Sequence, residues 1–177
     1  MSSPEPNRAR RLLALGAVVT LAAGLAGCIR PLYGSAGVTG GSAGTELAAI
    51  HVEPVGDYLG HELRNELDFL LTGGKPVLPA KYRLVVVPVS TRQGAVVDTL
   101  YGRSESATVA ITAQYKLYSA ADSKELSSGR AIISVSYDRT QERFANVRAE
   151  RDAMARGAKT LADQIRTQLA IYFATRK

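Results

Sequence analysis

The chain has 177 residues, with 22 Lys and Arg against 16 Asp and Glu and a formal net charge of +6. This positive charge is mild and not clustered, so the sequence argues against a nucleic-acid binder. Cysteine occurs once, which excludes a disulfide within one molecule.

The first 27 residues have the three parts of a secretory signal. Three arginines between residues 8 and 11 precede an apolar run, 12–26, whose 15 residues are fewer than the roughly 20 that a membrane-spanning helix needs. The sequence Leu-Ala-Gly then leads directly to Cys28. This pattern is typical of a bacterial lipoprotein signal, and it predicts cleavage before Cys28 and acylation of its thiol, so that acyl chains anchor the protein in a membrane. Ile29, which is not acidic, favours the outer membrane. The alternatives are an ordinary signal with an incidental cysteine and a weak N-terminal anchor helix.

Cleavage before Cys28 would leave 150 residues, the size of one ordinary domain. That part keeps 19 basic and 15 acidic residues, because residues 1–27 hold three arginines and one glutamate. Residues 28–45 are expected to form a lipidated N-terminus and a tether that is flexible because it is rich in Gly and Ser. Residues 46–175 are expected to form the single folded domain.

The first half of this domain predicts a strand, a helix and a second strand. Leu47 to Glu53 is expected to be a short strand. Tyr58 to Thr72 is expected to be a helix, capped by Asp57 and stopped by Gly73 and Gly74. Its apolar stripe is Leu59, Leu63, Leu67 and Leu70. A β-branched run from Tyr82 predicts the second strand, in which Pro88 marks an edge, a bulge or an end.

The second half predicts two alternating strands and a long helix. Ser104 to Tyr118 places odd-numbered apolar residues on one face, and Arg130 to Asp138 repeats this pattern after a turn at 120–125. Asn146 to Tyr172 has the 3.6-residue period of a helix, with Asn146 as its cap. Together the elements predict an α+β two-layer sandwich: a four-stranded, mainly antiparallel sheet with both helices on one face, in the order β-α-β-β-β-α.

Cys28 followed by Arg-Pro-Leu-Tyr-Gly at 30–34, together with this order of elements, resembles the lipopolysaccharide-assembly lipoprotein family LptE. The closing segment, with Phe-Ala-Asn at 144–146 and Leu-Ala-Asp-Gln-Ile at 161–165, is also similar to that family. The resemblance implies a non-catalytic lipoprotein that faces the periplasm, sits inside the LptD β-barrel of the outer membrane, supports its folding and helps to deliver lipopolysaccharide to the outer leaflet.

The resemblance directs attention to two sets of residues. Contact with the barrel is expected from the segment behind the lipid and from the polar outer face of the sheet: Arg30, Pro31, Leu32, Tyr33, Thr108, Thr112, Gln114, Ser134 and Ser136. A solvated sheet face would have the same polar pattern. Contact with lipopolysaccharide is expected from basic residues near strand ends, since Arg suits phosphate: Arg92, Arg103, Lys124 and Arg130.

No catalytic constellation is evident, and neither a metal site nor a cofactor site is expected. The two histidines, His51 and His61, lack the spacing of a zinc protease motif, and there is no Gly-x-Ser-x-Gly sequence. A periplasm-facing lipoprotein that binds peptidoglycan or supports a different envelope complex is the alternative function.

Overall fold

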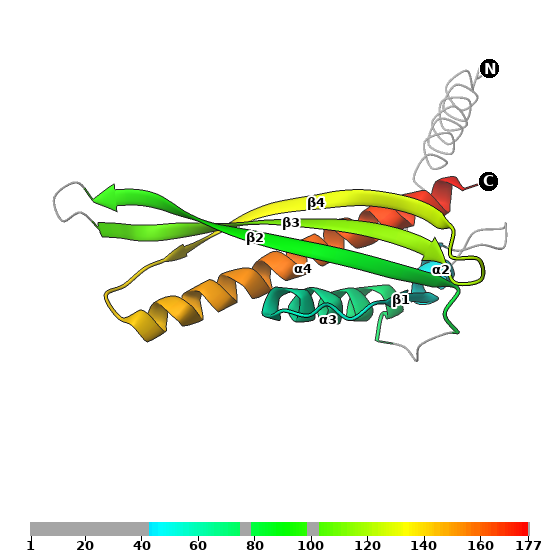
Figure 1. The fold of residues 1–177 in the computed structure, drawn as a ribbon, viewed down its shortest axis with the longest axis horizontal. Coiled ribbons are helices and arrows are strands. Elements are labelled where there is room, and N and C mark those ends of the chain that lie inside the picture. Colours follow the sequence, from blue (N-terminus) through cyan, green and yellow to red (C-terminus); the bar gives the residue numbers. More distant parts are fainter. Residues whose placement is uncertain (1–42, 75–78, 99–102, 177) are drawn as a thin grey trace, which may run out of the picture.

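The computed structural model describes residues 43–74, 79–98 and 103–176, and its described part is an elongated molecule of two layers (Figure 1). The elements are α2 (Ala43–Ala48), β1 (Ile50–Val52), α3 (Tyr58–Thr72), β2 (Tyr82–Asp98), β3 (Arg103–Ser119), β4 (Glu125–Asp138) and α4 (Arg143–Thr175). The sheet forms one layer and the helices form the other. The predicted α+β sandwich is therefore confirmed. The predicted signal, Cys28 and residues 30–33 lie outside the described residues.

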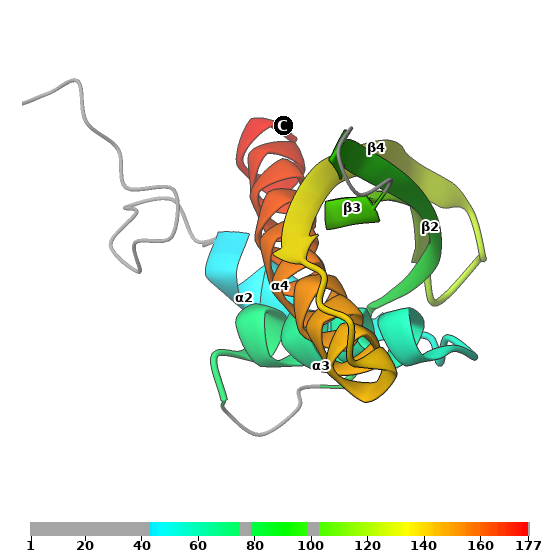
Figure 2. The ribbon, with the colours of Figure 1, turned by 90° about the vertical axis from the view of Figure 1, so that its left-hand side faces the viewer.

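The four strands form one sheet in the order β1-β2-β3-β4. β1 pairs with β2 in parallel over three residues, whereas the β2–β3 and β3–β4 pairs are antiparallel and long. At about 3.3 Å per residue, the 17-residue strands β2 and β3 each extend for roughly 55 Å. Viewed from its end, the twisted sheet arches over α4 (Figure 2).

The chain between residues 43 and 53 differs from its prediction. Leu47 and Ala48 belong to α2 rather than to the first strand, and β1 keeps only Ile50–Val52. Helix α2 also includes residues 43–45, the end of the predicted tether. Leu47 is buried in the core, so tertiary packing outweighs the weak helix propensity of the neighbouring glycine.

Helix α3 has the predicted bounds and both predicted caps. The side chain of Asp57 accepts a hydrogen bond from the N–H of Gly60 at 2.5 Å. Gly73 adopts a left-handed conformation (φ 64°), and its N–H bonds to the carbonyl of Phe69. The buried stripe ends at Leu71 rather than at the predicted Leu70, because the packed positions recur every four residues.

Strand β4 begins at Glu125, five residues before its predicted start at Arg130. The added segment is rich in Ser and Gly, so it has little strand propensity of its own. It is held by pairing with β3, where Gly129 lies opposite Tyr115. A Cβ atom at residue 129 would lie 2.6 Å from the hydroxyl of Tyr115, so glycine leaves the space that this ring occupies.

Helix α4 begins at Arg143, three residues before the predicted cap. Asn146 lies inside the helix, where its side chain accepts a hydrogen bond from the N–H of Thr140 (2.7 Å) and donates one to the carbonyl of Thr140 (2.9 Å). It therefore fixes the preceding loop instead of capping the helix. The helix runs along the inner face of the sheet and buries Ala158, Leu161, Ile165 and Leu169 against the odd-numbered residues of β3.

Candidate interaction surfaces

The face of the sheet away from the helices, here called the outer face, carries an exposed apolar row that crosses three strands. Val89 of β2 pairs with Thr112 of β3, which pairs with Ile132 of β4. Val89 is 59% exposed and Ile132 is 51% exposed. The next position of β2 on the same face is Val87, which is 57% exposed. These valines escaped the sequence analysis because an apolar β-branched run does not reveal which residues face a partner layer.

Short polar side chains surround this row. Thr108 and Ser136 share a hydrogen bond of 3.0 Å across the β3–β4 pair, and Ser134 lies opposite Ala110. Gln114 lies opposite both Val87 and Arg130. The structure thus places all five polar residues predicted for the outer face on one surface. We call this surface the outer-face patch: Val87, Val89, Thr91, Gln93, Thr108, Ala110, Thr112, Gln114, Ile132, Ser134 and Ser136.

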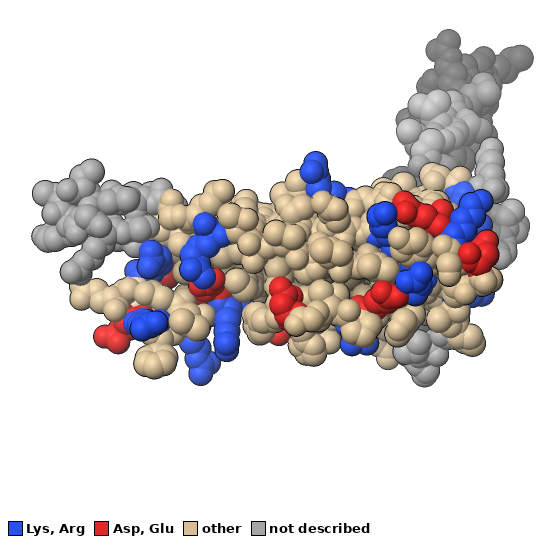
Figure 3. All heavy atoms as spheres, in the orientation of Figure 1, with Lys and Arg blue, Asp and Glu red and all other residues tan. Residues whose placement is uncertain are grey.

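The outer-face patch contains no charged residue. Arg130 borders the patch, exposed and opposite Gln114. Further charges on this face lie at the end near β1, where Arg83 forms an ion pair with Glu53 at 2.7 Å and lies 4.7 Å from the ring centre of Tyr118. Lys116 and Glu125 form a second pair there, at 3.3 Å. In Figure 3 the upper middle of the molecule, over the strands, is mostly tan, with one blue side chain projecting at its upper edge. Depletion of charge around a few exposed apolar residues is a feature of protein interfaces.

Each long edge of the sheet has features that hinder pairing with another strand. Beyond Leu84, β2 has no neighbour on its outer side among the described residues. Pro88 follows Leu84 by four residues, so its backbone faces the same side of β2 as the backbone of Leu84. A proline has no N–H to donate to a further strand on that side. On β4, the carbonyls of Arg130 and Ser136 accept hydrogen bonds from Gln168 and Arg156 of α4. Of the three positions predicted for Pro88, an edge, a bulge or a strand end, the described residues show an edge.

The structure does not bring the four predicted lipopolysaccharide residues together. Arg92 lies within β2 on the inner side of the sheet, and its Nε donates to Glu150 of α4 at 3.1 Å. Arg130 is exposed on the outer face, opposite Gln114. Lys124 is exposed in the turn before β4, at the end of the strands away from Arg103. Arg103 begins β3, and its side chain lies outside the described part.

At the end near the N-terminus of the described part, an ionised group ties α2 to β2. Glu46 accepts hydrogen bonds from the hydroxyl of Tyr82 at 2.7 Å and from Nζ of Lys81 at 3.3 Å. The bond from Tyr82, together with the charge of Lys81, holds the pKa of Glu46 below its ordinary value of 4.5. Burial and the same bond raise the pKa of Tyr82. This contact holds α2 against the start of β2.

The opposite end carries a second exposed apolar surface, which the sequence analysis missed. Tyr58 of α3 and Phe144 and Val147 of α4 line an open hollow of about 840 Å³, and Phe144 is 85% exposed. Arg148 and Arg151 also line it, and the guanidinium of Arg151 lies 5.5 Å from the ring centre of Tyr58. The first turns of α4 are the least apolar part of its sequence, so the spacing of apolar residues alone did not predict this exposed surface.

Within the described ranges, no group of His, Cys, Asp and Glu side chains is arranged to hold a metal ion, and no polar or charged side chain is buried. No helix in the same ranges combines the length and the hydropathy required to cross a membrane. The features that the described part does offer are an uncharged patch on the outer face of the sheet and a basic, apolar end. The described part therefore belongs to a class defined by its fold: an elongated α+β sandwich with two exposed apolar surfaces.

Comparison with known proteins identifies the family. The model of the LptE family, described as lipopolysaccharide-assembly, matches residues 47–169. The chain belongs to this family. No curated protein matches it.

Two crystal structures have a similar fold. One is of a protein described as a lipoprotein from Caulobacter crescentus CB15, with 23% identity and a TM-score of 0.64 over 76% of this chain and 97% of that one. The other is of rare lipoprotein B from Shewanella oneidensis, with 15% identity and a TM-score of 0.51 over 69% of this chain and 92% of that one. At these identities the two likenesses show the fold alone.

Proposed function

We propose that this chain is a non-catalytic outer-membrane lipoprotein, acylated at Cys28, that binds an LptD-type β-barrel and supports both barrel assembly and delivery of lipopolysaccharide to the outer leaflet. Family membership supports the role in lipopolysaccharide assembly. The lipoprotein signal supports the anchor and the periplasmic orientation. The names of the two structural neighbours, both lipoproteins, agree with this assignment.

The observation that carries the proposal is the outer-face patch. An uncharged surface with exposed Val87, Val89 and Ile132, surrounded by hydroxyl and amide groups, suits contact with the polar lumen of a barrel. Pro88 on β2 and the side chains of α4 on β4 hinder extension of the sheet, which favours a partner that binds the face. Residues 30–33, which follow the lipid, would contribute a second contact to the same barrel.

The experiment replaces Thr112 and Ile132 together by arginine and measures co-purification of the barrel from detergent-solubilised outer membranes. Both side chains point away from the core, so folding should persist, with a change in the thermal midpoint of less than about 3 °C. Two charges introduced into a desolvated contact should reduce recovery of the barrel at least about tenfold. The matched control is Asn65→Arg, a change of the same kind at an exposed position of α3. Equal recovery from wild type and the double variant would refute the proposed contact. Recovery of a different partner, or of peptidoglycan, would support the alternative function.

We also propose that basic residues contact the phosphate groups of lipopolysaccharide, with Arg92 and Arg103 on one hairpin and Lys124 and Arg130 near the next turn. Charge reversal at Arg92 and Arg103 should weaken binding in a pull-down with purified lipopolysaccharide. Arg92 already pairs with Glu150, so Glu150→Gln is the control that breaks this pair without reversing the charge at residue 92. Unchanged binding by the double reversal would remove both arginines from the site.

A further inference from the structure

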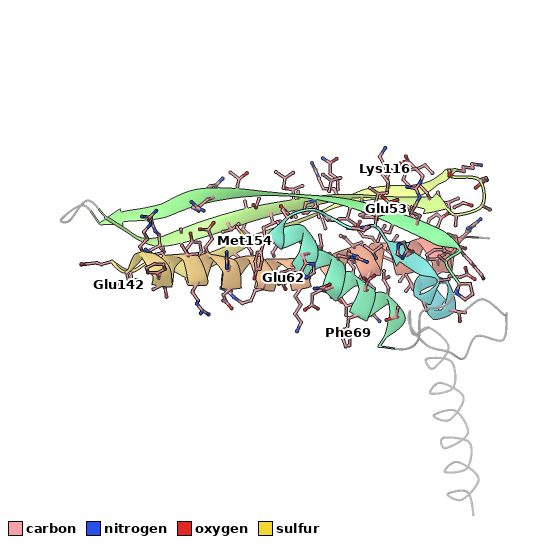
Figure 4. The ribbon with its side chains drawn as sticks, turned by 60° about the horizontal axis from the view of Figure 1, so that its bottom comes forward. Glu53, Glu62, Phe69, Lys116, Glu142 and Met154 are labelled. Carbon is pink, nitrogen blue, oxygen red and sulfur yellow. The ribbon has the colours of Figure 1, made fainter. Side chains whose placement is uncertain are left out.

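The hollow at the start of α4 combines exposed apolar groups with cations that have no acidic partner among the residues that the structure describes. We call it the tip patch and define it by Tyr58, Phe144, Val147, Arg148 and Arg151. All five side chains come from α3 and α4, so the tip patch lies in the helix layer. Figure 4 labels Glu142, the residue before α4, at this end of the molecule, far from Glu53 and Lys116 at the other end.

The charge of the tip patch is not neutralised within the described part of the chain. Asp152 lines the same hollow, but it pairs with Arg156 at 2.9 Å, and Glu150 pairs with Arg92. In the described ranges, neither Arg148 nor Arg151 has a carboxylate within 4.0 Å. Figure 3 shows Lys and Arg side chains gathered at this end. The complementary ligand is therefore anionic.

The apolar part indicates what else that ligand carries. A phenylalanine that is 85% exposed, next to Val147 and Tyr58, leaves apolar area in water that a bound aliphatic or aromatic side chain would cover. The first 14 residues of α4, 143–156, contain Arg but no Lys. Aromatic residues and Arg are enriched at protein interfaces, and Lys is depleted there. This composition favours an acidic polypeptide over a lipid surface, which Lys would serve equally well.

The position of the tip patch limits the shape of the partner. The outer-face patch lies on the far side of the sheet from the helix layer, so a partner with one flat surface would reach only one of the two patches. We propose that the tip patch docks an acidic segment, with an apolar side chain that packs on Phe144, from the same protein that covers the outer-face patch. That partner encloses the end of the molecule at which α4 begins. This inference rests on the proposed function, which assigns the outer-face patch to a barrel.

The experiment places a photo-activated benzoylphenylalanine at residue 144, in the full-length chain in intact cells, and identifies the attached product by mass spectrometry. The same group at residue 112 reports on the outer-face patch, and at residue 65 it serves as the control for an exposed helix position. The inference predicts that residue 144 crosslinks to a segment of the barrel with at least two Asp or Glu near the attachment point. Attachment to lipopolysaccharide, to phospholipid or to a second copy of the chain, or no attachment, would overturn it.

A charge variant tests the role of the arginines. Arg148→Glu with Arg151→Glu should reduce the crosslink from residue 144 about tenfold, which corresponds to about 1.4 kcal/mol. Arg148→Lys with Arg151→Lys should reduce it less, since charge is kept and only the planar geometry is lost. Equal crosslinking by the Glu variant and wild type would overturn the inference. The two proposals fail separately. A barrel crosslink from residue 112 without one from residue 144 contradicts only the tip patch, whereas no barrel crosslink from residue 112 contradicts the proposed function.

Discussion

Gly157 sets how closely α4 approaches the sheet, and this contact gives a sharp test of the packing. A Cβ atom at residue 157 would lie 2.5 Å from Cδ1 of Ile111, but at ordinary contact distances of 3.4 Å and 3.7 Å from Cγ2 of Val135 and Cγ2 of Ile133. One methyl group therefore obstructs alanine at this position. Ile111→Val removes that methyl group.

Three effects determine the expected changes in the free energy of unfolding, and they do not all act in the same direction. Alanine is favoured over glycine inside a helix by about 1 kcal/mol, whereas overpacking a core costs about 1–3 kcal/mol. Gly157→Ala alone should therefore lower the free energy of unfolding by up to about 2 kcal/mol. Ile111→Val alone should lower it by about 1 kcal/mol. In the double variant the new methyl group occupies the space that the old one leaves, so its stability should lie within about 0.5 kcal/mol of wild type.

Urea unfolding of the four proteins, without residues 1–28, measures this coupling. The predicted coupling free energy is about 2 kcal/mol in favour of the double variant. If the two single effects add to within about 0.5 kcal/mol, α4 does not pack on β3 as closely as the structure shows, and the reasoning is refuted.

Three further predictions concern the ends of the domain and its anchor. Asp57→Ala removes the bond to the N–H of Gly60 and should lower the free energy of unfolding by about 1 kcal/mol in urea titrations, whereas Asp57→Ser should restore most of it; equal stability of all three proteins would contradict the cap. Glu46 has a lowered pKa, so its ionised form stabilises the fold; this contribution is complete above pH 4.5 and is lost as the pH falls below that value. Glu46→Gln should therefore cost about 1 kcal/mol at pH 7 and less at pH 3 in thermal unfolding, and an equal cost at both pH values would contradict the role of the charge. Cys28→Ser should move the protein from the membrane fraction to the soluble fraction of fractionated cells and abolish labelling by radioactive palmitate; an unlabelled wild type, or a variant that stays with the membrane, would contradict acylation.

The sequence predicted the elements whose boundaries depend on residues close to them in the chain. Helix α3 has caps at both ends and apolar residues every four positions, so its bounds could be read directly. Segments whose conformation depends on distant partners were missed. Residues 125–129 pair with β3 because Gly129 leaves space for Tyr115, and Leu47 is helical because α2 packs into the core. No local pattern encodes either contact.

The residues of the candidate surfaces also fall into two groups: those that a local sequence pattern predicted and those that it did not. The alternation of β3 predicted correctly which residues face outward, including Thr108, Thr112 and Gln114. It did not predict that Val89 and Ile132 flank Thr112, because that row exists only in the register of three strands. Likewise, the position of Arg92 near a strand end suggested an exposed cation available to a ligand, whereas Arg92 is exposed but pairs with Glu150 of α4.

The central claim is that a barrel covers the outer-face patch in the outer membrane, and the most direct measurement is the accessibility of a thiol introduced at Thr112. Cys28 is the only cysteine of the chain and would be acylated, so Thr112→Cys would provide the only free thiol. The account predicts rapid maleimide labelling in the isolated protein, at least about tenfold slower labelling in intact outer membranes, and full labelling once the complex is denatured. Equal labelling rates in the isolated protein and in the membrane would contradict it.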